Sequence, residues 1–521
     1  MSNINDLIDE DQKKPFAKNA AVSKEHKEQA YNALKNGNSE RARMHYTASV
    51  KSDPNIKTTD VDRIVKDILR TESKNLICAR YKKWRDESAG SPQEHYDRAL
   101  LAVRELYYEL EDVAEFLQVR MEEWEFEHCS RLGIFLSALT NQVIKSGETL
   151  TLNVRNYTDF IGAFHEKGIL VVHSMDGPHN YYWWNFGYGM LGGKVVIKDG
   201  PGKGYGNHMV GGELVIEGEI VDEGLAYVEG GHAILHAFAD RNRTWGVDIE
   251  LGKSQSEGLI EILCDIHSGI QYLSREQTGG ELRVHKDVAC ENIGYGKKGG
   301  KTVVGSVLGK GWCQGIIGEF MESGEIIVEG NAGCTERKAL VGFRQKGGNI
   351  LIKGDVYCSS LGQDSWPGST IEVKGNVYGS VGDRETAGIK IFIGGDVHGD
   401  VGDGTWDMEC TIKGSVYGNV GNYFGRQHEK DRKRNGKIEI FGDVHGDVGN
   451  NMYKKSEVIV HGNVYGAVCE LCGGIVKVDG SIREVCPVQI GKVYRGGRDI
   501  TKTNKSLAVL RFFFGPLHGE K

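Results

Sequence analysis

The strongest constraint on this chain is a short glycine motif that recurs between residues 348 and 485. The template has two or three alternating apolar positions, then Gly, then Asp, Asn or Ser, then Val, then Tyr or His, and again Gly, as in IEVKGNVYGSVG and IEIFGDVHGDVG. The last copy, VKVDGSIREV, matches it only weakly. Successive copies are 21, 20, 19, 28, 20 and 18 residues apart, measured from their first glycines. Those glycines are Gly354, Gly375, Gly395, Gly414, Gly442, Gly462 and Gly480.

A repeat of about 20 residues with two short strands cannot bury its own apolar face, so its copies must stack on one another. In a parallel β-solenoid the coils lie about 4.8 Å apart and each strand pairs with its equivalent one coil along. We expect the repeat glycine at a corner, where the backbone takes a positive φ or approaches a neighbour closely, and the following valine inside. The insertion YFGRQHEKDRKRNG explains the separation of 28 residues as a charged loop. The alternative, a β-sandwich with glycine-rich turns, would not keep one motif in register over seven copies.

Residues 1 to about 146 have a different composition, with very little glycine and many helix-forming residues. From Pro92 to Lys145 the apolar residues recur at the spacing of a helix face. Ser91 before Pro92 predicts a helix start, and Gly147 is placed to end the helical pattern. We therefore predict an α+β multidomain chain, with an all-helical module over residues 1–146 and a long β-solenoid over residues 147–495.

Residues 30–55 of the helical module resemble the second half of a tetratricopeptide repeat. Gly37-Asn38 is followed by Ala42 and Tyr46, and Asp53-Pro54-Asn55 closes the segment. Such repeats have a period near 34 residues and need about three copies to be stable, but no clean second copy is present. The segment is either one degenerate repeat that docks partner proteins or an ordinary helical hairpin that ends in Asp-Pro.

Residues 187–334 carry a looser glycine pattern, in strings such as GYGMLGGKVVIKDG and MESGEIIVEGNAG. These strings resemble the GXGXG domain, the right-handed parallel β-helix that occurs in the large chain of glutamate synthase and in one chain of formylmethanofuran dehydrogenase. The resemblance extends over about residues 187–486 and implies a right-handed β-helix that is architectural rather than catalytic. The matching residues are Met190, Gly192, Gly193, Met209, Gly211, Gly212, Gly218, Gly324, Gly330 and Gly333.

The function that this resemblance implies is that of a non-catalytic scaffold subunit in a multi-subunit oxidoreductase-type complex. The chain has no N-terminal cysteine amidotransferase domain, iron–sulfur spacing or flavin-binding barrel, so flavin, iron–sulfur, molybdenum or tungsten centres would come only from partner subunits. Those partners would be proteins bound through the helical module and the faces of the β-helix. The sequence itself points to no catalytic residue, although it leaves enzymatic activity open.

The tighter GDVHGDVG copies also resemble bactofilins, β-helical proteins that polymerise end to end. This resemblance makes a self-assembling structural homo-oligomer the alternative function. An uncovered end coil would expose a row of unpaired backbone groups and invite polymerisation. We expect residues 496–521 to cap the last coil or to dock on a partner, and the two ends of the solenoid then decide between a discrete subunit and a filament.

The overall charge argues against several classes of partner and compartment. A net charge of −8 gives no electrostatic basis for binding nucleic acid or an anionic membrane. The first residues carry charges of both signs and no apolar core, unlike a secretory signal, and no stretch approaches the roughly 18 uninterrupted apolar residues of a membrane-spanning helix. Eleven cysteines in 521 residues are too few for a disulfide scaffold. These features predict a cytoplasmic protein with reduced thiols.

The densest aromatic run of the chain is a candidate ligand site or interface. It contains Tyr181, Tyr182, Trp183 and Trp184, and His208 follows in the same histidine-rich region. Aromatic faces with nearby amides can hold sugars, flavins or side chains of a partner, whereas bulky rings can also cover the first coil of a solenoid. A ligand-binding protein or an enzyme that uses residues 165–236 is therefore the third functional hypothesis.

Cysteines near the end of the solenoid are the candidate metal ligands. Cys469 and Cys472 form a CxxC, and Cys486 follows at a distance at which an adjacent coil could bring it close. Thiolates with this spacing can bind zinc together with ligands from neighbouring coils. A second CxxC is missing, so a redox pair and simple packing of the thiols stay open as alternatives.

Overall fold

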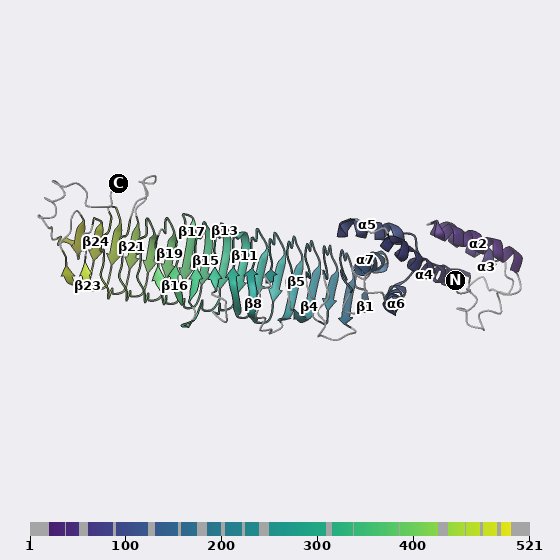
Figure 1. Ribbon diagram of the computed structural model, residues 1–521, viewed down its shortest axis with the longest axis horizontal. Helices are drawn as coiled ribbons and strands as arrows, with labels where there is room; N and C mark the ends of the chain where they lie inside the picture. Colours follow the sequence, from purple (N-terminus) through teal and green to yellow (C-terminus); the bar gives the residue numbers. More distant parts are fainter. Residues whose placement is uncertain are drawn as a thin grey trace. The chain divides into compact units, whose positions relative to one another are not determined.

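The computed structural model (Figure 1) shows a helical region followed by a parallel β-solenoid, as the sequence predicts. The chain divides into two compact units, one of residues 1–205 with 212–215 and one of residues 206–211 with 216–521. The structure describes residues 20–36, 38–51, 61–86, 90–122, 131–154, 158–174, 185–199, 204–220, 224–238, 249–308, 315–336, 338–384, 386–425, 436–453, 455–468, 473–486 and 491–501.

The helical region contains six helices among the residues that the structure describes. They are α2 (Ala20–Lys35), α3 (Ser39–Lys51), α4 (Val61–Asp86), α5 (Pro92–Val103), α6 (Leu110–Glu122) and α7 (Leu132–Val143). α2 and α3 pack against each other, with Ala30, Leu34, Ala42 and Tyr46 buried. Gly37 and residues 53–55 lie outside the described part of the chain, so the resemblance to a tetratricopeptide repeat stays a prediction.

The start of α5 confirms the helix signal at Ser91. The Ser91 hydroxyl accepts a hydrogen bond from the backbone N–H of Glu94 at 3.3 Å, and the Glu94 carboxylate accepts one from the backbone N–H of Ser91 at 2.6 Å. This reciprocal capping box satisfies two N–H groups that a helix start leaves free. The role expected for Gly147 is wrong. Helix α7 ends at Val143, because the buried Ile144 is already extended, and Gly147 lies in the turn before the first strand with a φ of 83°.

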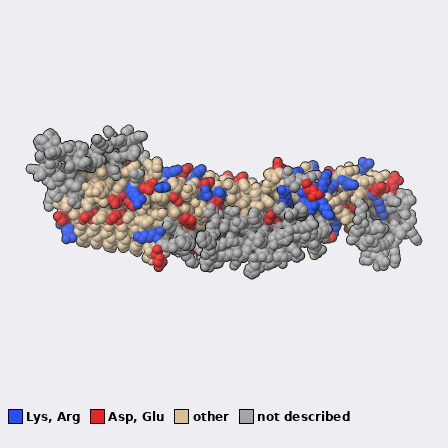
Figure 2. Space-filling model, viewed as in Figure 1, with Lys and Arg blue, Asp and Glu red and all other residues tan. Residues whose placement is uncertain are grey.

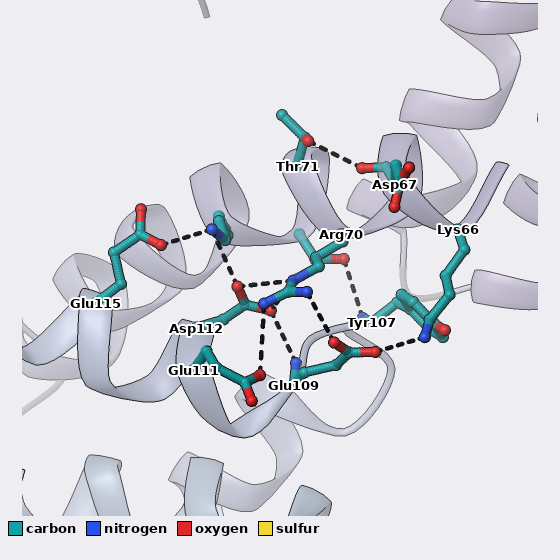
Figure 3. A network of polar contacts seen from close by, with 11 residues as sticks. Lys66, Asp67, Arg70, Thr71, Tyr107, Glu109, Glu111, Asp112 and Glu115 are labelled. Carbon is teal, nitrogen blue, oxygen red and sulfur yellow. Dashed lines mark hydrogen bonds and ion pairs between the residues drawn. The ribbon is translucent and has the colours of Figure 1, made fainter. Parts of the chain in front are cut away.

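A network of charged side chains joins α4 to α6 (Figure 3). The fully buried carboxylate of Asp112 accepts hydrogen bonds from Arg70 Nε at 2.6 Å and from the backbone N–H of Glu109 at 2.8 Å, and pairs with Lys74 Nζ at 3.0 Å. Burial alone would raise the pKa of Asp112, but these hydrogen bonds hold it below its usual value. The ionised carboxylate therefore holds the first turn of α6 against α4.

The solenoid has one long face of parallel strands. In the first unit these are β1 (Thr149–Val154), β2 (Ile169–Ser174) and β3 (Lys194–Ile197), and β4 (Glu213–Ile220) includes residues of both units. In the second unit they are β5 (His232–Phe238), β7 (Leu259–Ile262), β9 (Glu281–Val284), β11 (Lys298–Val304), β13 (Ser323–Val328), β15 (Gly348–Ile352), β17 (Ser369–Val373), β19 (Lys390–Ile393), β20 (Glu409–Ile412), β21 (Lys437–Ile440), β22 (Glu457–Val460), β24 (Ile475–Val478) and β26 (Lys492–Arg495), with the short β27 (Arg498–Asp499) at the end.

The register of this face places the apolar positions of the repeat inside. Ile371 pairs with Ile391, Ile391 with Cys410, and both strands of each pair run in parallel. Ile438 pairs with Val458 in the same way. These residues are buried, whereas their neighbours along each strand are partly exposed, as a half-buried strand requires. The alternation seen in the sequence is therefore the inner surface of the solenoid.

A second sheet of seven parallel strands forms another face within the second unit. Its strands are β6 (Ile249–Leu251), β8 (Ile266–Leu273), β10 (Val288–Ile293), β12 (Ile316–Ile317), β14 (Ala339–Val341), β16 (Cys358–Leu361) and β18 (Ser380–Val381). Beyond β18, isolated bridges between valines continue the stack until β23 (Val464–Val468) pairs with β25 (Ile482–Val485). Val377, Val397 and Val416 are fully buried, which confirms that the repeat valine points inward.

In the described part of the chain, no helix combines the length and the apolar character needed to cross a membrane.

Candidate functional site

The repeat glycines let successive coils approach each other closely. A Cβ atom on Gly395 would lie 2.7 Å from the carbonyl oxygen of Gly375, and one on Gly462 would lie 2.4 Å from that of Gly442. Real Cβ contacts are never so short, and neither glycine has a positive φ. The repeat glycine is therefore required by the close approach of neighbouring coils and not by a positive φ.

The Tyr or His of the first six copies forms a column of stacked rings, which we call the aromatic column. Neighbouring ring centroids are 4.6, 4.6, 4.8, 4.7 and 5.0 Å apart, and the ring planes are nearly parallel. Because the faces cover one another, the ring edges are what solvent or a partner meets, and Tyr417 and Tyr465 remain 47% and 46% exposed. The column consists of Tyr357, Tyr378, His398, Tyr417, His445 and Tyr465.

Polar side chains flank the aromatic column and join the coils. The side-chain oxygen of Asp355 accepts a hydrogen bond from the backbone N–H of Asn376 at 2.7 Å. The side-chain amide oxygen of Asn376 in turn accepts a hydrogen bond from the backbone N–H of Asp396 at 2.8 Å. Coils with His carry two aspartates, as in DVHGD, whereas the coils of Tyr378, Tyr417 and Tyr465 carry Asn, Ser or Ala at these places. The coil of Tyr357 carries one aspartate, Asp355, and its neighbour in the next coil is Asn376. Aspartates therefore do not stack directly on one another, which avoids repulsion between like charges. This face offers a partner ring edges, hydroxyls and carboxylates at a regular spacing.

Helix α7 covers the first coil of the solenoid within the first unit. Residues Leu132 to Asn141 are all buried. Gly133 packs so tightly on the turn after β1 that a Cβ atom there would lie 2.2 Å from the carbonyl oxygen of Asp159. The amide of Asn141 donates to the carbonyl oxygen of Phe164 at 2.7 Å and accepts the backbone N–H of Glu166 at 3.1 Å. The helical region therefore covers the interior that this coil would otherwise expose.

A hairpin covers the last described strand of the solenoid in the second unit. β26 pairs with β24 on one edge and with the antiparallel β27 on the other. Gly496 and Gly497 form the two-residue turn with φ values of 50° and 78°, the conformation that tight hairpins require. The hydroxyl oxygen of Thr501 accepts a hydrogen bond from the backbone N–H of Val493 at 3.0 Å. The sequence predicts that the tail of residues 496–521 caps the last coil or docks on a partner. Its residues 496–501 fold back in this way, and residues 502–521 lie outside the described part.

A buried polar network inside the solenoid was not predicted from the sequence. The fully buried amine of Lys297 donates to the side-chain oxygen of Gln277 and to Thr302 Oγ1 at 3.1 Å. Thr302 donates to Ser274 at 2.8 Å. Burial lowers the pKa of Lys297 to about 7, a value suited to acid–base catalysis. The side chain is 0% exposed, however, so we interpret the network as part of the core.

The sequence does carry a signal for this network. A buried Gln, Lys or Met stands three residues before a glycine of positive φ in successive coils, as at Gln277, Lys297 and Met321. Met190 and Met209, which belong to the GXGXG resemblance, hold the same position and are also buried. The spacing is visible in the sequence, but only stacked coils show that these side chains meet inside.

The structure locates only part of the predicted aromatic site. Tyr181, Tyr182, Trp183 and Trp184 lie outside the described residues. His208 has a φ of 58° and its ring stacks on Tyr227 at 4.9 Å, so it belongs to a corner between coils. With four of these five residues outside the described part of the chain, a ligand site in this region stays a prediction.

Cys469 and Cys472 also lie outside the described residues, whereas Cys486 is half-buried. The backbone N–H of Cys486 donates to the carbonyl oxygen of Val468 at 3.0 Å. Cys486 therefore lies one coil along from Val468, which directly precedes Cys469 in the sequence. Within the described ranges, which omit the CxxC, no three His, Cys, Asp or Glu side chains are grouped as a metal site would need. The zinc hypothesis stays a prediction.

Comparisons of the chain with protein-family models, with curated proteins and with solved structures gave no match. The resemblances to GXGXG domains and to bactofilins therefore rest on the repeat pattern of the sequence.

Proposed function

We propose that this chain is a non-catalytic scaffold subunit, a solenoid with covered ends whose helical region and side faces bind other proteins. The observation that carries the proposal is the covering of both ends, by α7 on the first coil and by β27 on Tyr494 and Arg495 of the last described strand. Paired or covered edges do not serve as templates for a further strand. The surfaces that remain for partners are the sides.

The resemblance to GXGXG domains suggests which partners these are. In that family the β-helix supports subunits that hold flavin, iron–sulfur or metal centres. We propose the same place for this chain, in an oxidoreductase-type complex whose redox centres belong to the partner subunits.

Affinity purification of a tagged chain at native expression level tests this proposal. We expect protein subunits to co-purify in fixed stoichiometry, and those with redox cofactors would identify the class of complex. Recovery of the chain alone, or turnover of a substrate by the purified chain with its own cofactor, would contradict the proposal.

A second candidate is self-assembly of the kind that the bactofilin resemblance suggests. The half-exposed rings of the aromatic column favour it, because a regular face of this sort can associate sideways even when the ends are covered. Sedimentation velocity from dilute to concentrated solution separates the two functions. A scaffold subunit keeps one small assembly state, whereas a structural polymer grows with concentration.

A further inference from the structure

The helical region contains an open groove with an apolar floor, within the first unit. Its volume is about 730 Å³, and its walls come from α4, α5 and the end of α2. Leu76 and Trp84 are buried in its floor, whereas Leu101 on α5 is 67% exposed at the rim. An exposed leucine beside a buried tryptophan gives a partner an apolar anchor point.

The rim of this groove is strongly basic, and Figure 2 shows Lys and Arg side chains close together over the helical region. Among the described residues that line it, Glu105 is the one carboxylate. Arg80 holds the walls together, because its guanidinium donates to the carbonyl oxygens of Ala102 at 2.5 Å and of Leu34 at 3.2 Å. The basic residues of the lining are Lys35, Arg80, Lys83, Arg98 and Arg104. Such a groove fits an acidic segment that also carries apolar side chains.

The N-terminal part of this chain contains a segment of that kind. Residues 5–11 read NDLIDED, with four carboxylates around Leu7 and Ile8 and no basic residue. The segment precedes α2, whose far end at Lys35 lines the groove. Sixteen helical residues span about 24 Å, and the nine residues from Asp11 to Ala20 reach up to about 30 Å when extended. The segment can therefore reach the groove along α2.

We propose that this groove binds the acidic segment of residues 5–11 of the same chain. The carboxylates face the basic rim, and Leu7 and Ile8 pack against Leu101 and Trp84. A protein partner that uses the groove must then displace the segment, so the contact makes docking at the helical region competitive. This inference needs no assumption about the partners of the scaffold.

A labelled peptide of residues 1–16 tests the contact by fluorescence anisotropy, with the full-length chain as receptor. In the variant D6N/D9N/E10Q/D11N the chain's own segment no longer competes. We expect the peptide to bind this variant with a Kd at least about tenfold lower than that for the wild-type chain, because a tethered segment has a high effective concentration. Raising the ionic strength from about 0.05 M to about 0.5 M should weaken the binding, since the contact is largely between opposite charges.

Groove variants show where the peptide binds. Adding K83Q/R104Q to the amide variant should raise the Kd about tenfold, whereas the matched pair K298Q/K353Q on the solenoid should leave it unchanged. Equal affinity of the peptide for the wild-type chain and the amide variant, or indifference to K83Q/R104Q, would overturn the proposal. A wild-type dimer that the amide variant abolishes in sedimentation would also overturn it, because the segment would then occupy the groove of a second copy.

Discussion

Lys297 shows how a single side chain can set the pH dependence of this fold. Its amine lies inside the solenoid between positions held by Gln277 and Met321, and burial lowers its pKa to about 7. In the unfolded chain the amine keeps its proton up to about pH 10.4. Below pH 7 both states bind the proton, and the folded state bears the full cost of burying the charge. As the pH rises from about 7 to about 10, the folded state loses its proton first and this cost disappears.

We predict that Lys297→Met stabilises the protein at pH 6 by several kcal/mol and that the gain shrinks towards pH 10. Methionine has a similar length, and Met321 already occupies the equivalent position one coil along. Scanning calorimetry of the variant and the wild type from about pH 6 to about pH 10 measures the difference. The exposed neighbour variant Lys298→Met should show no such trend, and a gain independent of pH would contradict the argument.

At the level of elements, the sequence predicts the features that local patterns determine better than it predicts contacts between residues far apart in the chain. The glycine spacing and the apolar alternation give the strands and the inward valines, and Ser91-Pro92 gives the start of α5. The end of α7 could not be predicted, because Ile144 turns away to pack near Gly168, far along the chain. The aromatic column was missed for a related reason, since ring stacking depends on the exact register between coils.

The contact between α4 and α6 is another arrangement that the sequence does not reveal, because Arg70 and Asp112 are 42 residues apart. We predict that Asp112→Asn lowers the free energy of unfolding of the helical region by about 3 kcal/mol, because it leaves Arg70 and Lys74 beside a buried neutral amide. The melting of the helices, followed by circular dichroism, measures this loss. Glu115→Gln removes an exposed partner of Lys74 and should cost less than about 1 kcal/mol. Equal effects of the two variants would show that burial does not matter here.

For the whole molecule, the covering of the solenoid ends decides between a discrete subunit and a polymer. A solenoid coil leaves its backbone groups and its apolar interior open at each end unless another element covers them. Here the covers are unrelated, a buried helix at the first coil and a glycine hairpin at the last described strand. Residues 132–141 of α7 are all buried, whereas β27 pairs with only two residues of β26.

We predict that Gly133→Ala uncovers the first coil. The new Cβ would lie 2.2 Å from the carbonyl oxygen of Asp159 and 2.4 Å from the carbonyl carbon of Phe160, and backbone atoms cannot yield as a flexible side chain would. Helix α7 must therefore move off the coil, at a cost of about 1–3 kcal/mol. We expect a lower Tm together with association that increases with concentration in sedimentation velocity.

Gly147→Ala is the matched control, because its Cβ would meet no atom within 4 Å and only the φ of 83° is strained. That variant should lose about 1 kcal/mol and sediment as the wild type does. Gly133→Ala with the stability and the sedimentation of the wild type would show that α7 is not what keeps this end from associating.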